Sequence, residues 1–343
     1  MTRRELLSSF ALAMQRARFG AAVALVEKAA AAGSVAAASL YIRQGGFVVD
    51  RGFGKATGPG TVFLLASITK PMTAAGLMIL ADRGQLSLSD PVRKHIPEFT
   101  GGDRDMVTLR HLLTHTSGLP DMLPENNDLR RKHAPLKEFV AGACRTPLLF
   151  KPGVECRYQS MGILLASEIA ERVTRMPFRE FLRRELFERL AMKQTSLGLG
   201  GRRISETALS EVTGDDDWNW NSPYWRDLGA PWGGAHSTAA EVARFLAMFR
   251  DPSNGILKPE TTRAMIRNQN EGLNKPWGIG WMVQAGAFGK SCSPDTYGHW
   301  GSTGTVAWHD RRKDLTCVLL TTKPAEQSRA GLLGPVSDAV SGA

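Results

Sequence analysis

Ser67 and Lys70 are the residues whose types and spacing most clearly suggest chemistry. They lie in the segment Ser-Ile-Thr-Lys, which follows an apolar run and opens a stretch with a helical pattern, residues 71–83. Positions i and i+3 share one face of a helix, so the lysine amine can reach the serine oxygen and act as its base. The helix N-terminus would favour negative charge on that oxygen. The alternative is a capping serine beside a solvated lysine, but the apolar stretch favours burial, which lowers a lysine pKa towards use as a base.

Two further segments could complete a site for acyl transfer. Tyr158, in the segment Tyr-Gln-Ser, could relay protons, because a cationic lysine nearby makes loss of the phenolic proton easier. Residues 299–302, His-Trp-Gly-Ser, could supply donors for the oxyanion of a tetrahedral intermediate, and their glycine would let the backbone approach a ligand closely. The alternatives are an ordinary half-buried tyrosine and a glycine-rich turn between strands.

Together these segments resemble the serine β-lactamase and penicillin-binding protein superfamily, whose signature begins with S-x-x-K. The tyrosine in the second motif is similar to the class C branch, the class C β-lactamase-related serine hydrolases. That branch includes class C β-lactamases, D-Ala-D-Ala carboxypeptidases, D-aminopeptidases and family VIII carboxylesterases. Residues 108–119 (TLRHLLTHTSGL) and 231–238 (PWGGAHST) are also similar to this branch, and the resemblance runs from about residue 20 to residue 335.

The resemblance implies a role for each residue. Ser67 would attack a carbonyl and form an acyl-enzyme, and Lys70 would accept its proton or keep Tyr158 ionised. Tyr158 would pass the proton to the leaving group and later activate water. The backbone N–H groups of Ser67 and Ser302 would form the oxyanion hole. The residues expected to contact the substrate are Ser160, His299, Trp300 and Gly301.

Two departures from the class C β-lactamases bear on the substrate. Ser160 stands where they carry asparagine, and residues 299–301, His-Trp-Gly, stand where they carry Lys-Thr-Gly. That lysine helps to hold the carboxylate of penicillin-type ligands, whereas a histidine is often neutral near pH 7 and binds anions less well. Trp300 is expected to narrow the cleft or stack over it. Both changes argue against an efficient β-lactamase and favour a carboxylesterase.

Three functions therefore remain in order of preference. The first is a serine hydrolase that cleaves carboxylic esters or amides, most simply a carboxylesterase of the family VIII type. The second is a β-lactamase, a D-Ala-D-Ala carboxypeptidase or a D-aminopeptidase. The third is a non-catalytic binding or sensor protein on the same fold. Four aromatic residues could form a lip over an apolar acyl or alcohol group, or could equally be core: Trp218, Trp220, Tyr224 and Trp225.

His111 and His115 are interpreted as structural rather than catalytic. In the resemblance their segment caps and packs a helix end, and local hydrogen bonding is the commoner role for such residues. We therefore expect both side chains to support the site without taking part in the chemistry.

The pattern of elements predicts how the site is positioned. The expected strands are residues 35–43, 46–51, 278–283, 304–309 and 315–321, and the expected helices include 19–32, 160–173, 178–190 and 325–341. Residues 238–241 predict a capping box before a further helix. We predict an α/β (α+β) fold of the β-lactamase/transpeptidase-like type. Residues 19–80 and 235–343 would form an antiparallel sheet from both chain ends, flanked by helices, and 81–234 an inserted helical domain. The nucleophile would lie where the two meet.

Composition excludes several classes of partner. The chain has 343 residues and a net charge of +10, but its basic residues lie in many short clusters, so we predict no nucleic-acid partner. No apolar run approaches the ~18 residues of a membrane span. The four cysteines match no zinc pattern and are predicted to be free thiols. We predict no cofactor and no metal, with a small-molecule ester, β-lactam or peptide as substrate; the oligomeric state is not predicted.

The N-terminal segment carries incomplete features of an export signal. Residues 2–7, Thr-Arg-Arg-Glu-Leu-Leu, are similar to the start of a twin-arginine signal. The charged residues of 15–18 interrupt the following apolar region, and no clear cleavage site comes after it. Residues 1–18 are therefore predicted to be an N-terminal extension or a degenerate export signal, with a cytoplasmic location favoured and export as the alternative.

Overall fold

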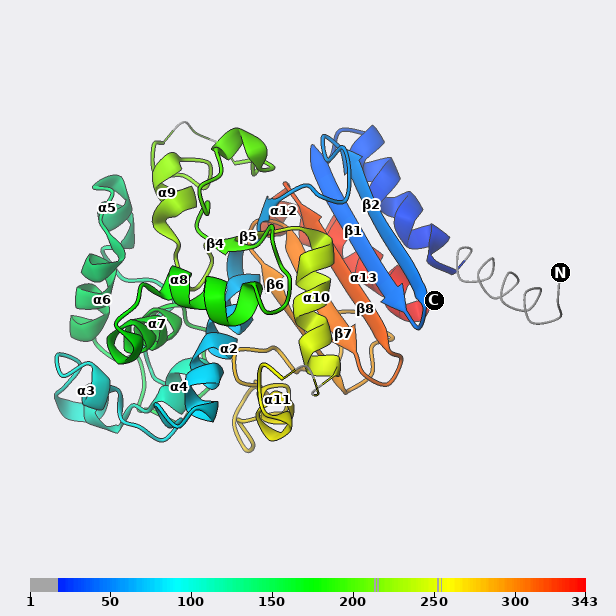
Figure 1. Cartoon of the computed structure of the whole chain (residues 1–343). Helices are drawn as coiled ribbons and strands as arrows, with labels where there is room; N and C mark the ends of the chain where they lie inside the picture. Colours follow the sequence, from blue (N-terminus) through cyan, green and yellow to red (C-terminus); the bar gives the residue numbers. More distant parts are fainter. Residues whose placement is uncertain (1–17, 213, 215, 252, 254) are drawn as a thin grey trace.

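The core of the molecule is an antiparallel sheet built from the two ends of the chain. The computed structural model describes residues 18–212, 214, 216–251, 253 and 255–343, so the signal-like segment lies almost wholly outside the described residues. The five strands are ordered β2-β1-β8-β7-β6 (Figure 1). Their bounds are β1 Ala37–Gln44, β2 Phe47–Gly54, β6 Thr296–Gly301, β7 Thr305–Asp310 and β8 Leu315–Thr321. This confirms the predicted fold class.

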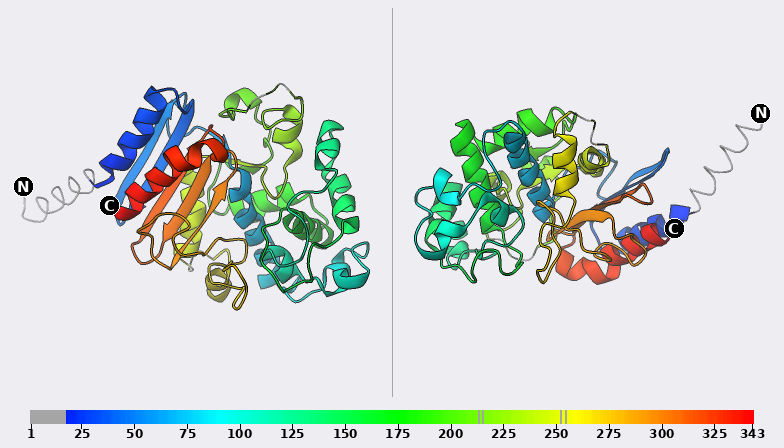
Figure 2. Two further views of the ribbon diagram at one scale, coloured as in Figure 1. Left: turned by 180° about the vertical axis from the view of Figure 1, so that it is seen from behind. Right: turned by 90° about the horizontal axis from the view of Figure 1, so that it is seen from below.

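Alternation of side chains along β8 gives the sheet two buried faces. Leu315, Cys317 and Leu319 pack with residues of the terminal helices, whereas Val318 and Leu320 belong to the core on the other side. The first face is covered by the helix at residues 18–31 and by the C-terminal helical segments (Figure 2). These segments are α12 Ala325–Ser328, η6 Arg329–Leu333 and α13 Gly334–Gly342. The second face is covered by α10 Ala239–Arg250 (Figure 1).

A mostly helical region lies beside the sheet, and α2 Thr69–Asp82 connects the two. Nearly every residue of α2 is buried, and the helix packs against α7 Met161–Thr174 and α8 Phe178–Leu182. The other helices of this region are α3 Val92–His95, α4 Leu109–Leu113, α5 Asn126–Arg131, α6 Leu136–Arg145 and α9 Pro223–Leu228. A small sheet in the order β3-β5-β4 contains Phe63–Leu64, Ala235–Ser237 and Ser196–Leu197. The domain boundaries given above stay a prediction.

Three local predictions differ from the structure. The strand predicted at 278–283 is wrong: only Met282 forms isolated bridges there, because the backbone turns at Gly280, whose φ is 78°. The helix predicted at 178–190 is shorter, since α8 passes into a π-helical turn, η3 Arg183–Phe187. Thr238 caps α10 by accepting from the backbone N–H of Glu241. The capping box is not reciprocal, however, because the Glu241 carboxylate accepts from Gln194 N and Thr195 Oγ1.

Two features of the described residues bear on partners and cofactors. In the ranges given above, no helix combines the length and the apolar character that crossing a membrane requires. The same part of the chain contains no group of three or more histidine, cysteine or acidic side chains placed to hold a metal ion. All four cysteines are free thiols, as predicted.

Candidate active site

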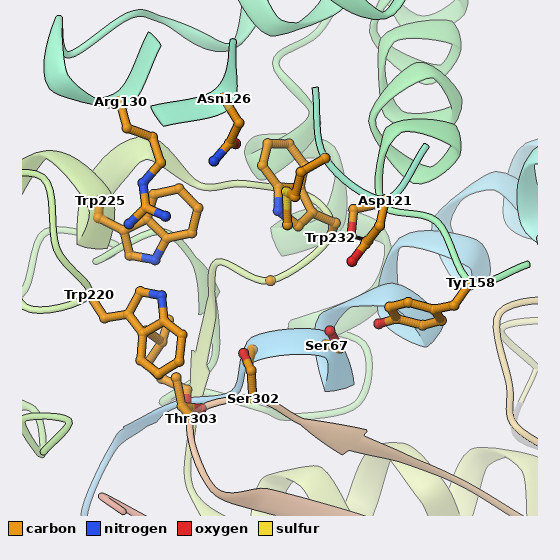
Figure 3. Close-up of a pocket in the computed structure, with 15 residues that line it drawn as sticks. Ser67, Asp121, Asn126, Arg130, Tyr158, Trp220, Trp225, Trp232, Ser302 and Thr303 are labelled. Carbon is orange, nitrogen blue, oxygen red and sulfur yellow. Dashed lines mark hydrogen bonds between the residues drawn. The ribbon is translucent and has the colours of Figure 1, made fainter. Parts of the chain in front are cut away.

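A pocket of about 320 Å³ lies where the sheet meets the helical region, and Ser67 lines it (Figure 3). Its walls come from the end of β3, from the turn between β6 and β7, from α5 and α9, and from the loops around them. Besides Ser67 the lining residues are Leu64, Ala66, Asp121, Met122, Asn126, Arg130, Tyr158, Ser160, Trp220, Trp225, Trp232, Gly233, Ser302 and Thr303.

Ser67 is presented on a sharp turn between β3 and α2. Ala66 adopts a left-handed conformation with φ of 48°, which is costly for a residue with a side chain and is held by its surroundings. The Ala66 carbonyl accepts a 2.7 Å hydrogen bond from Thr69 Oγ1. Thr69 Oγ1 in turn accepts from Ala235 N at 3.0 Å. The turn is therefore tied to β5, and the half-buried Ser67 side chain faces the pocket.

The turn between β6 and β7 is fastened to the strand that precedes Ser67. Thr303 Oγ1 donates to Leu64 O at 2.7 Å, and Thr305 Oγ1 donates to Leu65 O at 2.8 Å. Gly301 permits this approach, because a Cβ atom there would lie 2.4 Å from Leu65 O. Ser302 is thereby placed in the wall of the same pocket as Ser67 (Figure 3).

Lys70 lies one helical turn beyond Ser67 and is completely buried. Its Nζ atom is 3.0 Å from Ser67 Oγ and donates to Trp232 O, also at 3.0 Å. Burial lowers the pKa of Lys70 to about 7, and the negative charge of Asp121 partly opposes that shift. A substantial fraction of Lys70 is therefore neutral near pH 7, with a lone pair available to take the serine proton.

Tyr158 approaches the same pair from the loop that precedes α7. The Nζ atom of Lys70 lies 4.6 Å from the centroid of the phenol ring. Burial raises the pKa of Tyr158 well above its usual range, and contact with the Ser67 hydroxyl lowers it only in part. Desolvation of the phenolate and the negative charge of Asp121 therefore both disfavour the ionised tyrosine considered from the sequence. Of the two side chains that approach Ser67, Lys70 is the one whose pKa is lowered towards neutral pH.

The segment that contains His111 and His115 fixes the loop of Tyr158. His115 O accepts from Arg157 N at 2.9 Å, and His115 Nδ1 accepts from Gln159 N at 3.1 Å. The imidazole also packs against the Tyr158 ring at a centroid distance of 4.8 Å. His111 caps α4, since its Nδ1 accepts from Thr108 N at 3.2 Å. Both side chains thus support neighbouring backbone, and the expectation that neither takes part in the chemistry stays a prediction.

Ser160 lines the pocket and is held by a carboxylate. Its hydroxyl donates to Asp121 Oδ1 at 2.6 Å. Asp121 follows directly after the segment 108–119 and a proline, so reading that segment two residues further would have found it. Its charge acts on both Lys70 and Tyr158 by raising the pKa of each.

Indole rings form much of the remaining wall. Trp220 and Trp225 line the pocket, as suggested for a lip, and Trp232 joins them (Figure 3). Trp218 and Tyr224 are not among the lining residues. The Tyr224 hydroxyl donates to Ala134 O at 2.8 Å, and Trp218 contacts two arginines.

Comparison with known proteins now assigns the family. The Beta-lactamase family model matches residues 22–339, nearly the whole chain. The chain belongs to the Beta-lactamase family. The chain is thus a serine hydrolase of this family, and the catalytic roles of Ser67, Lys70 and Tyr158 stay predictions.

Proteins with sequences similar to this chain are named for different activities. It is 28% identical over 347 residues to Esterase EstB of Burkholderia gladioli, covering 88% of this chain and 86% of EstB. It is 29% identical over 315 residues to a Putative D-alanyl-D-alanine carboxypeptidase of Escherichia coli (strain K12), covering 77% of this chain and 70% of that relative. The match to Protein flp of Staphylococcus aureus (strain MRSA252) is 28% identical and spans 50% of this chain but only 37% of that longer relative.

Solved structures share the fold over nearly the full length. EstCE1, described as a hydrolase with promiscuous acyltransferase activity, superposes with a TM-score of 0.80 at 20% identity, over 96% of this chain and 100% of EstCE1. D-amino acid amidase from Ochrobactrum anthropi SV3 gives a TM-score of 0.74 at 22% identity, over 92% of this chain and 97% of the amidase. At these identities the likeness concerns the fold.

Residues 299–301 are not among the residues that line the pocket, and their contact with substrate stays a prediction. The buried His299 ring approaches Trp300 O with its Nδ1 at 2.6 Å, and burial lowers the pKa of His299 to about 3. Trp300 does not stack over the cleft. It packs on Phe288, lies beneath the Arg329 guanidinium and donates to Ala287 O. Gly301 has no side chain, which lets the end of β6 lie close to the Leu65 carbonyl.

Arg130 and Trp232 are pocket residues that sequence reasoning did not single out. Trp232 lies in the segment 231–238 that resembles the family, and its carbonyl holds Lys70. Arg130 lies among charged residues of α5, which are typical of a solvated face, so no local signal marked it.

Proposed function

We propose that the protein is a carboxylesterase that acts through an acyl-enzyme on Ser67. The observation that carries the proposal is the fully buried Lys70 amine, 3.0 Å from Ser67 Oγ and with a pKa lowered to about 7. A serine hydroxyl is a weak nucleophile unless a base is in contact with it. Here the base is held in place by a second hydrogen bond, to Trp232 O.

Acylation begins when neutral Lys70 takes the proton of Ser67 as Oγ attacks the ester carbonyl. The backbone N–H groups of Ser67 and Ser302 are proposed to stabilise the oxyanion, a contribution of about 3 kcal/mol per donor to the barrier. Tyr158 then gives its proton to the leaving alkoxide as the C–O bond breaks. The protonated Lys70 returns a proton to Tyr158, so the amine is neutral again and Ser67 is acylated.

Deacylation repeats these proton transfers with water in place of the alcohol. Lys70, directly or through Tyr158, takes a proton from water as its oxygen attacks the acyl carbonyl. Ser67 Oγ leaves and recovers a proton from the same relay. Burial of Tyr158 disfavours its anion, so the phenol holds its proton until the leaving group needs it. This supports a mechanism in which Lys70 takes up the first proton and Tyr158 passes one on.

Three observations support an ester as the substrate. His299 stands where class C β-lactamases carry a lysine that holds the substrate carboxylate, and it is buried, neutral and outside the pocket wall. The indoles of Trp220, Trp225 and Trp232 provide an apolar wall suited to an acyl chain. The relative EstB, named an esterase, matches over 86% of its length.

Covalent labelling tests whether Ser67 is the nucleophile. A fluorophosphonate probe is expected to add one adduct to the wild-type protein by intact mass, and none to Ser67→Ala. Ser302→Ala is the matched control, because it keeps the backbone N–H proposed for the oxyanion hole and should be labelled. A protein that is not labelled and hydrolyses no ester would instead be the non-catalytic binding or sensor protein.

A substrate panel tests the preference for esters. We expect 4-nitrophenyl butyrate to be hydrolysed with a higher kcat/KM than nitrocefin or D-alanyl-D-alanine peptides. The relative named a putative D-alanyl-D-alanine carboxypeptidase makes the peptide the second candidate. Faster turnover of nitrocefin or of the peptide would reverse the ranking while leaving the acyl-enzyme mechanism in place.

A further inference from the structure

Arg130 presents a positive charge to the pocket that contains Ser67. It belongs to α5, and its guanidinium lies 4.0 Å from the Trp225 ring centroid and 5.0 Å from that of Trp218. One terminal nitrogen donates to Trp218 O at 2.8 Å. The half-buried side chain is thereby held in one position against two indole faces, which is a pre-organised arrangement for a planar cation (Figure 3).

In the part of the chain that the structure describes, the Arg130 guanidinium forms no ion pair, and its Nε atom is buried without a hydrogen-bond partner. The neighbouring Arg131 differs, since it pairs with Asp128 at 2.7 Å. Aromatic faces attract a cation without neutralising it, so a carboxylate that reached Arg130 would gain a charge-assisted hydrogen bond.

The position of Arg130 indicates which part of a substrate would reach it. Tyr158 lies on one side of Ser67, whereas Arg130, Trp220 and Trp225 lie on the other (Figure 3). In the proposed mechanism Tyr158 protonates the leaving group, so the alcohol lies towards Tyr158. The acyl chain must then extend past the indoles towards Arg130.

Asp121 adds a second, opposite charge that favours the same orientation. Its carboxylate lines the pocket on the Tyr158 side, beside Ser160 (Figure 3). An anionic group on the alcohol would be repelled there, whereas an anionic end on the acyl chain would meet Arg130. The pocket is thus polarised along the direction of the bound substrate.

We propose that Arg130 binds a carboxylate at the far end of the acyl chain, so that the preferred substrates are half-esters of linear dicarboxylic acids. The apolar methylene chain would lie along Trp220 and Trp225, and the free carboxylate would pair with the guanidinium. This inference rests on the proposed esterase function, because it assigns the acyl side of the pocket from the role of Tyr158.

Two 4-nitrophenyl esters with the same acyl-chain length test the inference. Mono-4-nitrophenyl suberate carries the free carboxylate, and methyl 4-nitrophenyl suberate is its neutral counterpart. The wild-type enzyme should hydrolyse the anionic ester with the higher kcat/KM. Arg130→Met should lower kcat/KM for the anionic ester about tenfold to a hundredfold, the range of a charged hydrogen bond. The loss for the neutral ester should be much smaller, so the ratio of the two kcat/KM values reports the contact between Arg130 and the carboxylate.

Controls separate recognition from a structural role. Arg131→Met removes a neighbouring cation that is already paired, and should alter neither ester. Arg130→Lys keeps the charge and should keep part of the preference, which provides a second variant if Arg130→Met does not fold. An equal loss for both esters in the Arg130 variants would overturn the inference, as would a wild-type enzyme without preference for the anion. Hydrolysis of neither ester would instead contradict the proposed function.

Discussion

Ser160 donates a 2.6 Å hydrogen bond to Asp121 and so fixes a carboxylate in the wall of the pocket that contains Ser67. Burial lowers the pKa of Lys70, and the charge of Asp121 raises it by a smaller amount. The result is a pKa of about 7. Because the proposed base is neutral Lys70, ester hydrolysis should rise with pH through about 7. Removing the carboxylate should move this rise to lower pH.

Asp121→Asn tests that relationship through the pH profile of kcat/KM on a neutral ester. The amide keeps the shape of the side chain but loses its charge, so the pKa of Lys70 should fall and the acid limb should shift downward. Asp128→Asn is the matched control, since Asp128 is exposed and pairs with Arg131. An unchanged or upward-shifted limb in Asp121→Asn would show that Lys70 does not control the profile.

The pKa of Lys70 also makes a prediction about folding that is independent of catalysis. The group has a pKa of about 7 when folded and 10.5 when exposed, so between these values the unfolded chain binds more protons. The contribution of Lys70 to stability therefore rises with pH, by on the order of 1 kcal/mol per pH unit in that window. Urea denaturation of wild type and Lys70→Met measures it, because other groups cancel in the difference.

The expected result is a stability gap that depends on pH. Lys70→Met should be the more stable protein below pH 7, since burying the charged amine costs free energy. The gap should then narrow as pH rises from 7 towards 10.5. A gap that is constant over this window would mean that the folded protein keeps Lys70 charged.

Tyr158→Phe removes one hydroxyl from a ring that stays packed against His115. Loss of the proposed proton donor should lower kcat about 10²- to 10⁴-fold, the usual range for general acid–base groups. Tyr224→Phe is the control, because that hydroxyl donates to Ala134 O and Tyr224 is not among the residues that line the pocket. Combining Tyr158→Phe with Lys70→Ala should cost less than the product of the separate losses, since the residues act as a unit. Near-normal turnover by Tyr158→Phe would remove it from the mechanism.

The sequence predicted the parts of this molecule that depend on local spacing. Ser67 and Lys70 meet because they are three residues apart where the turn after β3 leads into α2, and the strands at the two chain ends pair as expected. Tyr158 could be predicted to join them only through the family resemblance, because its loop is fixed by remote hydrogen bonds to His115.

Other features of the structure could not be predicted, because they depend on the course of loops and on the direction in which side chains point. Trp300 was expected over the cleft, but its position in β6 turns the indole towards Phe288 and Arg329. Arg130 enters the pocket because the loop around Trp218 meets α5, a contact across almost ninety positions in the chain. Residues 278–283 have the composition of a strand, yet the positive φ of Gly280 interrupts any extended run.

Gly301 provides the last prediction, because it determines how closely the turn after β6 approaches the Ser67 turn. A Cβ atom at this position would lie 2.1 Å from Thr305 Oγ1 and 2.4 Å from Leu65 O. Gly301→Ala should therefore destabilise the fold by about 1–3 kcal/mol, the usual cost of overpacking. Ester hydrolysis should fall as well, since the displaced turn carries Ser302.

Gly331→Ala is the matched control for Gly301→Ala. A Cβ atom at Gly331 would meet nothing within 4 Å, so both stability and activity should stay close to those of the wild type. Urea denaturation and hydrolysis of a neutral ester measure the two effects on the same samples. If Gly301→Ala unfolds at the wild-type urea concentration and keeps its rate, the spacing between the two turns does not hold Ser302 in place. A loss of rate without a loss of stability would instead show that the turn moves to relieve the clash, which separates the position of Ser302 from the stability of the sheet.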